Sequence, residues 1–102
     1  MKIEFYIGAG RDKDDTPIAM EEAWAIRAKL QAKLTEHFGG WTEIPGCAGE
    51  WEGIKEPVYR FDVLTEHEPA SENLHKISAE LRDIARQTCI AVNVVKSDVM
   101  FV

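Results

Sequence analysis

The sequence predicts a single α+β domain with two helices and four strands in the order β-α-β-β-α-β. Two segments alternate apolar and polar residues, which is typical of half-buried strands. Two longer segments repeat apolar residues at three- and four-residue steps, which is typical of helices. The chain has 102 residues and an apolar content of 45%. It therefore has room for one domain, residues 1–102, and enough apolar side chains for one core.

The first strand is expected at residues 2–9, where Ile3, Phe5 and Ile7 alternate with Glu4 and Tyr6. An acidic, glycine-punctuated loop follows. The helix should begin with Thr16 as its cap and Pro17 at its first position. Gly39 and Gly40 should end it after about 22 residues. Its predicted buried stripe consists of Ala19, Ala23, Ile26, Leu30, Leu34 and Phe38.

Two strands are expected between the helices. The first begins at Trp41–Ile44, is interrupted by Pro45 and Gly46, and resumes near residues 49–53 after a bulge or turn. Pro45 argues against a central position in the sheet, because proline cannot donate to a strand ladder. Pro57 should open the next strand. The predicted core-facing positions of that strand are Tyr59, Phe61 and Val63.

A second helix and a final strand complete the pattern. Ser71 is the expected cap of the helix. Its predicted buried stripe consists of Leu74, Ile77, Leu81, Ile84 and Ala85. The run Cys89–Val95 is nearly all apolar, which suggests a strand covered on both faces. The apolar tail Val99–Val102 is compatible with a short further strand and should not be free in water.

This element order is that of the ferredoxin-like plait, a four-stranded antiparallel sheet with two helices on one face. We expect the first strand and the Cys89–Val95 strand to run in its middle. The uncovered face should be rich in apolar side chains, which predicts a homodimer. The alternative is a monomer whose open face is covered by a loop at Cys47–Lys55 and by the C-terminal tail. The residues expected on that open face are Tyr6, Val58, Arg60, Leu64, and Val95 or Ala91.

Charge and cysteine usage narrow the classes of partner. The net charge of −6 argues against nonspecific nucleic-acid binding, which draws on clustered Lys and Arg. Cys47 and Cys89 fit no disulfide or metal spacing, so we expect reduced thiols and a cytoplasmic protein. The charged N-terminus is unlike a signal peptide, and no apolar stretch approaches ~18 residues, so no membrane association is expected.

Three short patterns carry a resemblance. They are Phe38-Gly39-Gly40-Trp41-Thr42, Gly49-Glu50-Trp51 and Glu56-Pro57-Val58, and Trp24 in the first helix also fits. Together they resemble a set of small uncharacterised bacterial and phage proteins with Phe-x-Gly-x-Thr followed by Gly-x-Trp and a Glu-led strand. The resemblance covers about the first two-thirds of the chain. It implies a ferredoxin-like fold and carries no activity with it.

Two loop patterns are candidate ligand sites. Gly8-Ala9-Gly10 after a strand is similar to a phosphate-binding turn, but the third glycine is missing and the aspartates beside it would repel phosphate. Asp12, Asp14 and Asp15 would suit a hard cation, but they lack the calcium-loop spacing. We therefore expect a solvated loop with no metal and no cofactor.

The histidines and cysteines are candidates for acid–base and thiol chemistry. His37, His67 and His75 titrate near neutrality, but no pattern brings two of them together. Cys47 is the better thiol candidate because we place it in a flexible loop, whereas Cys89 should be buried and inert. We name no catalytic residue.

The binding residues that we predict are Tyr6, Trp41, Trp51, Arg60 and His67. Aromatic and arginine side chains are typical interface anchors, and Trp51 should be partly exposed between two glutamates. The leading hypothesis is a non-enzymatic protein-interaction module acting as a dimer. One form of it is a phage or mobile-element inhibitor of a host protein. The alternatives are a small-molecule or nucleotide-binding protein or small enzyme with its site on the open face, and a structural component of an assembly.

Overall fold

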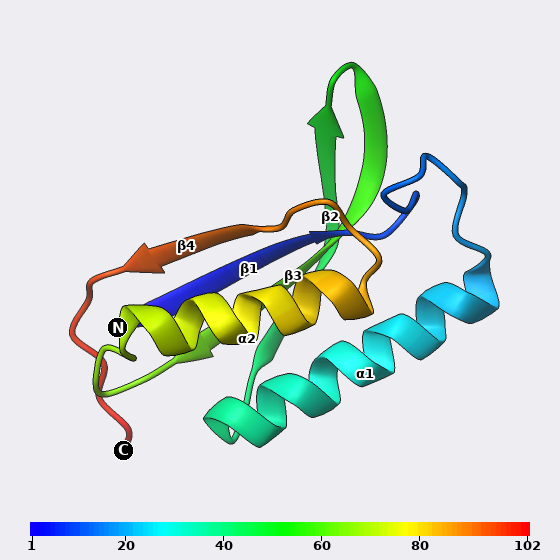
Figure 1. The fold of residues 1–102 in the computed structure, drawn as a ribbon. Helices are drawn as coiled ribbons and strands as arrows, with labels where there is room; N and C mark the ends of the chain where they lie inside the picture. Colours follow the sequence, from blue (N-terminus) through cyan, green and yellow to red (C-terminus); the bar gives the residue numbers. More distant parts are fainter.

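A computed structural model describes the backbone of residues 1–102 and every side chain except that of Trp51. Its single antiparallel sheet has the strand order β2-β3-β1-β4, and both helices lie on one face of it (Figure 1). This is the ferredoxin-like α+β arrangement that the sequence predicts. The elements in chain order are β1 (Lys2–Gly8), α1 (Met20–Phe38), β2 (Thr42–Trp51), β3 (Ile54–Leu64), α2 (Ser71–Ile84) and β4 (Ala91–Val95).

The core lies between the sheet and the two helices. Phe5 on β1 is paired in register with Phe61 on β3, and both side chains are fully buried. Leu30 and Leu34 of α1 and Leu81 of α2 cover them from the helical layer. The alternation predicted for β1 and β3 is thus confirmed: every second side chain enters one apolar layer.

The start of α1 differs from the prediction. The helix begins at Met20, and the loop before it is closed by Asp12, whose Oδ1 accepts hydrogen bonds from the N–H groups of Asp14 and Thr16. Thr16 is therefore held in a turn and does not cap the helix, and Ala19 is exposed outside it. The helix has 19 residues as a result. Its end at the left-handed Gly39 is confirmed, with the glycine N–H donating to the carbonyl of Thr35.

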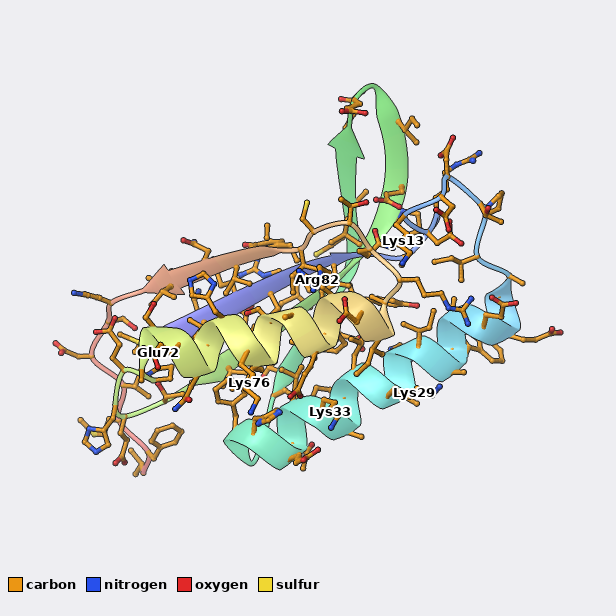
Figure 2. All side chains as sticks on the ribbon, viewed as in Figure 1. Lys13, Lys29, Lys33, Glu72, Lys76 and Arg82 are labelled. Atoms are coloured by element: carbon orange, nitrogen blue, oxygen red, sulfur yellow. The ribbon has the colours of Figure 1, made fainter. Side chains whose placement is uncertain are left out.

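Helix α2 buries Ile77 and Leu81 of the predicted stripe, whereas Leu74 and Ile84 are half-buried and the buried Ala85 follows the helix. Ser71 is the first residue of the helix and makes no capping hydrogen bond. The polar faces of both helices point away from the sheet: Figure 2 shows Lys29 and Lys33 on α1 and Lys76 on α2 along the outer surface of the helical layer.

Within the part of the chain that the structure describes, neither helix has the length and apolar character needed to cross a membrane.

The position of β4 corrects a prediction. β1 and β3 are the central strands, whereas β4 pairs only with β1 and forms an edge. Because helices cover one face alone, Val92 is half-buried while Ala91 and Asn93 are exposed on the other side. Cys89 lies before this strand and is exposed, so the prediction that it is buried is also wrong. The tail at 96–102 forms no strand, and its last three residues are exposed.

The long β2–β3 hairpin projects beyond the rest of the sheet (Figure 1). The predicted bulge in β2 lies between Ile44 and Cys47, and β2 is an edge strand as expected. The predicted resumption of this strand near residues 49–53 is confirmed. Residues 47–55, which the monomer alternative treats as a covering loop, belong to the hairpin, which turns through residues 52–53 with positive φ. Pro57 lies inside β3 and does not open it, and its carbonyl accepts a hydrogen bond from the Ala9 N–H. This projecting hairpin forms a wall of each hollow described below.

Candidate functional site

The face of the sheet opposite the helices is open, and its centre is charged. The register places Glu4 of β1 between Asp62 of β3 and Asn93 of β4, and it places Tyr6 beside Arg60. The predicted members Tyr6, Val58, Arg60 and Leu64 do share this face. The expectation that the face is mainly apolar is wrong for its centre, because polar side chains occupy the middle of the central strands.

Glu4 is the centre of a closed hydrogen-bond network. Its carboxylate oxygens lie 2.8 Å from Asn93 Nδ2, 2.9 Å from Arg60 Nη2, and 3.1 Å from both Lys2 Nζ and Tyr6 Oη. The hydrogen bond from Asn93, followed by that from Lys2, lowers the pKa of Glu4 from the usual 4.5 to about 2. Burial opposes this change but is outweighed. Glu4 is therefore ionised throughout the physiological pH range.

Arg60 holds the second half of the network. Its guanidinium binds the Asp62 carboxylate at 3.1 and 3.2 Å, and its Cζ lies 5.4 Å from the centre of the Tyr6 ring. The bond to Asp62 raises the pKa of Arg60, whereas burial and the bond to Glu4 raise the pKa of Tyr6. Two predicted binding residues, Tyr6 and Arg60, are thus brought together and held rigidly.

The other predicted binding residues do not join them. Trp41 packs edge-on against the core residue Phe61, with ring centres 5.7 Å apart, and its Nε1 donates to Thr35 Oγ1. His67 lies in the loop after β3, where its carbonyl accepts a hydrogen bond from Thr65. This is the end of the sheet at which β1 begins, away from Tyr6. Trp51 pairs through its backbone with Ile54, and its side chain lies outside the described residues.

A groove of about 800 Å³ runs along the open face at the end of the sheet where β1 ends. Its floor includes Tyr6, Val58 and Ala91. The projecting hairpin forms one wall, and the other walls come from the loop at 11–15 and from residues 87–90 before β4. Both cysteines line it. Cys47 is half-buried in β2, not in a flexible loop, with its Sγ 3.5 Å from the carbonyl of Ile44.

The glycine loop after β1 already holds an anion, and that anion belongs to the chain itself. The carboxylate of Glu56 on β3 accepts hydrogen bonds from the N–H groups of Gly10 at 3.2 Å and Arg11 at 3.3 Å. The Gln87 side chain ties the same loop to α2 by donating to the carbonyls of Arg11 and Ala85. The loop therefore fastens the hairpin to the sheet, which supports the interpretation of a structural loop over a phosphate site.

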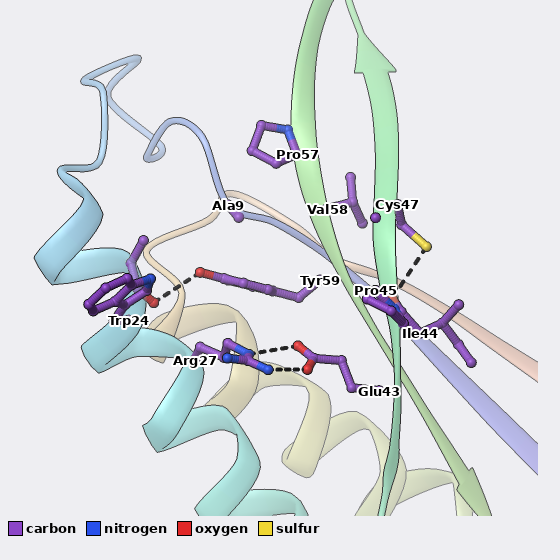
Figure 3. Close-up of a pocket in the computed structure, with 12 residues that line it drawn as sticks. Ala9, Trp24, Arg27, Glu43, Ile44, Pro45, Cys47, Pro57, Val58 and Tyr59 are labelled. Atoms are coloured by element: carbon purple, nitrogen blue, oxygen red, sulfur yellow. Dashed lines mark hydrogen bonds and ion pairs between the residues drawn. The ribbon is translucent and has the colours of Figure 1, made fainter.

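A second hollow of about 370 Å³ lies on the helix side, between the first half of α1 and the hairpin strands (Figure 3). Tyr59 donates from its hydroxyl to the carbonyl of Ala23 at 2.9 Å, and burial raises the pKa of Tyr59. Arg27 binds Glu43 through two nitrogens, with Nε 2.8 Å from Oε1. Trp24 stands at the rim with 67% of its surface exposed. Pro45 and Pro57 complete the apolar lining.

The exposure of Trp24 was not anticipated from the sequence, although a signal was present. The buried stripe of α1 follows Ala23, Ile26 and Leu30, and Trp24 does not fall on it. Met20, four residues earlier, shares the face of Trp24 and is 70% exposed. Met20 and Trp24 therefore form an exposed apolar surface on α1 outside its buried stripe.

The other candidate residues are the two histidines of the helices and the aspartates of the acidic loop. His37 Nε2 lies 3.0 Å from Glu80 Oε2, which joins α1 to α2 and lowers the pKa of Glu80. His75 is exposed on α2. Asp15 of the acidic loop pairs with Arg11. These contacts support the fold, and the histidines lie on different elements.

Comparison of the chain with family models, with curated proteins and with solved structures finds no match. The two hollows and the charged network are therefore interpreted from their own chemistry. The network is saturated with hydrogen bonds, which suits a rigid support, whereas each hollow offers apolar surface that water covers poorly.

Replacing Glu4 by glutamine should weaken the pH dependence of stability in acid. The pKa of Glu4 in the folded chain is below its unfolded value, so its contribution is complete above about pH 4.5 and is lost as the pH falls toward 2. Urea denaturation between pH 2.5 and 6 should show a shallower fall in the free energy of unfolding for Glu4→Gln than for wild type. Glu66→Gln, an exposed loop change, is the control. Parallel curves for wild type and Glu4→Gln would contradict the assignment.

Replacing Gly8 by alanine should release the hairpin from the glycine loop. A Cβ at this position would lie 2.5 Å from Glu56 Oε1 and 2.8 Å from Gln87 Oε1. We expect a loss of about 0.5–1.5 kcal/mol in the free energy of unfolding, because the ends of the Glu56 and Gln87 side chains must move aside, which weakens the hydrogen bonds of Glu56 to the loop. Hydrogen exchange at the Gly10 amide should quicken. In Gly40→Ala, the control, the new methyl group meets no atom within 4 Å. Equal stability of the two variants would contradict the proposed role of this contact.

Proposed function

We propose that this chain is a non-enzymatic protein-interaction module that binds a partner protein through the Trp24 surface, defined as Met20, Trp24 and the helix-side hollow beside them. The observation that carries the proposal is the exposure of Trp24 at the rim of an apolar hollow. Tryptophan, tyrosine and arginine dominate the energetic centres of protein interfaces, and Trp24, Tyr59 and Arg27 meet here.

The rigidity of this surface favours binding. Tyr59 is tied to the backbone of α1, and Arg27 is tied to Glu43 of β2, so the hollow keeps its shape without a partner. A preformed site avoids much of the side-chain entropy that is lost when an interface forms. The hollow would accept an apolar side chain of the partner, with the indole of Trp24 covering it.

The charges around the Trp24 surface favour a basic partner. Arg27 is neutralised by Glu43, whereas Glu21 lies one turn before Trp24 and has no ion-pair partner among the described residues. A lysine or arginine of the partner can contact Glu21 and the face of the indole ring together. The net charge of −6 draws such a partner toward the whole molecule. An inhibitor of a basic host protein would be one form of this function.

The state of the open-face network supports binding over acid–base catalysis. Glu4 stays ionised at neutral pH because its pKa is about 2, and the raised pKa of Tyr6 keeps its hydroxyl protonated. Neither group exchanges its proton near neutrality, which is what a general acid or base must do. Their contribution is to hold the sheet rigid behind the interaction surface.

Alanine at position 24 should weaken binding by about 30-fold, which corresponds to the loss of one energetic centre of about 2 kcal/mol. The partner is first captured on the immobilised chain and identified, and its affinity is then measured with purified proteins by calorimetry. Lys29→Ala, an exposed change on the same helix, should bind as wild type does. The proposal is wrong if the purified partner binds Trp24→Ala as tightly as wild type, or if every captured protein is retained equally by both.

We also propose that the chain forms a homodimer through its open face. Ile54 and Leu64 lie at opposite ends of β3, and both are exposed and apolar. Two copies facing each other would cover these side chains while each charged network stays satisfied internally. Sedimentation equilibrium should give twice the monomer mass of 11.5 kDa, and Leu64→Lys should lower that mass toward one chain. A single-chain mass for wild type at 100 micromolar would exclude the dimer.

A further inference from the structure

The outer edge of β4 presents backbone groups that can pair with another strand. The N–H of Ala9 donates to the carbonyl of Pro57 directly opposite, so the odd-numbered residues of β1 form hydrogen-bonded pairs with β3. Successive residues of a strand direct these groups to opposite sides, so the even-numbered residues of β1 are paired with β4. Their partners on β4 are Ala91, Asn93 and Val95. Val92 and Val94 therefore direct their N–H and C=O groups away from the sheet.

Nothing in the described part of the chain pairs with this outer edge. β4 has β1 as its single neighbour and forms the outer margin of the sheet (Figure 1). No hydrogen bond joins the backbone of Val92 or Val94 to a loop among the described residues. The side chain of Val94 lies on the helix side of the sheet, in the row of Ile3, and is still 37% exposed. The edge therefore leaves both backbone groups and apolar surface to water.

The opposite edge of the sheet carries features that prevent such pairing, and β4 lacks them. β2 contains Pro45, a bulge after Ile44, and the charged residues Glu43 and Glu50. Proline, bulges and charges are the means by which natural proteins protect the edges of their sheets. β4 contains no proline and no charged residue, and its pairing with β1 has no register shift. The chain therefore protects one edge and leaves the other able to pair.

We propose that β4 pairs with β4 of a second copy of this chain, antiparallel and about a two-fold axis at Asn93. The order Val92-Asn93-Val94 reads the same in both directions, so Val92 lies opposite Val94 of the second copy. Each of the two valine pairs exchanges both of its N–H and C=O groups, which satisfies the free backbone groups of the edge. The valine side chains then form cross-strand pairs on the helix side and cover the exposed part of Val94.

This contact leaves the open face and the Trp24 surface free, so it is independent of both interactions proposed above. A two-fold axis perpendicular to the sheet joins the two sheets edge to edge and keeps the helices of both copies on one face. The two Trp24 surfaces lie on that face beside β2, at the outer ends of the joined sheet. Edge pairing ends at two copies because both outer edges are then the protected β2 strands.

Amide hydrogen exchange of the ¹⁵N-labelled full chain tests the contact residue by residue. At low concentration the Val92 and Val94 amides should exchange quickly, whereas the Asn93 amide is protected by its pairing with Glu4. We expect a Kd on the order of 0.2 millimolar, as befits a small interface. Raising the protein from about 20 micromolar to about 1 millimolar should then slow the two valine amides by about threefold. A dimer through the open face alone leaves these amides unchanged.

Variants at position 94 decide whether the edge makes the contact. Val94→Pro removes an outward N–H, which an edge strand tolerates, and should abolish the slowing at Val92. Val94→Lys keeps the N–H and adds an edge charge, so it tests the contact if the proline variant does not fold. Val94→Thr, the control, keeps the N–H and the branched shape and should behave as wild type.

Leu64→Lys separates this contact from the open-face dimer, because Leu64 lies two strands away from β4 and should leave the slowing intact. The proposal is overturned if the Val92 amide at the higher concentration exchanges equally fast in wild type and Val94→Lys. It is also overturned if Val94→Thr abolishes the slowing as fully as Val94→Lys does. Loss of the slowing in Leu64→Lys would assign the protection to the open face instead.

Discussion

The carboxylate of Glu4 lies in the middle of a central strand, where an ionised group is tolerated only if hydrogen-bond donors surround it. Lys2, Arg60, Asn93 and Tyr6 supply those donors from three strands. An apolar layer cannot replace them without leaving a charge unpaired. This polar centre occupies the face of the sheet opposite the helices, and the open-face groove lies beside it at Tyr6.

Local rules in the sequence account for most of the fold. Ile3, Phe5 and Ile7 enter the core because strand side chains alternate, and this alternation is independent of distant contacts. Gly39 ends α1 because it adopts φ of 80°, which side chains with a Cβ rarely accept. Pro45 identifies an edge strand for an equally local reason, its missing N–H.

The predictions fail where the structure depends on strand pairing between distant segments or on a competing hydrogen bond. Thr16 is a favourable capping residue, but its N–H donates to the Asp12 carboxylate. This hydrogen bond holds Thr16 in a turn before the helix begins. The apolar run before Val95 is typical of a central strand, yet strand order depends on pairing between distant segments, and β4 has only one neighbour. The two hollows depend on how far the hairpin projects past Gly8. Of the predicted binding residues, only Tyr6 and Arg60 are brought together, because register alone places them side by side.

The hairpin strands separate the two hollows, and Cys47 and Val58 contribute to both. The bulge at Gly46 bends the hairpin, and the hydrogen bonds from the Gly10 and Arg11 N–H groups to Glu56 hold it against the glycine loop. Because the same two residues line both hollows, a substitution at either position alters the lining on both sides of the hairpin at once.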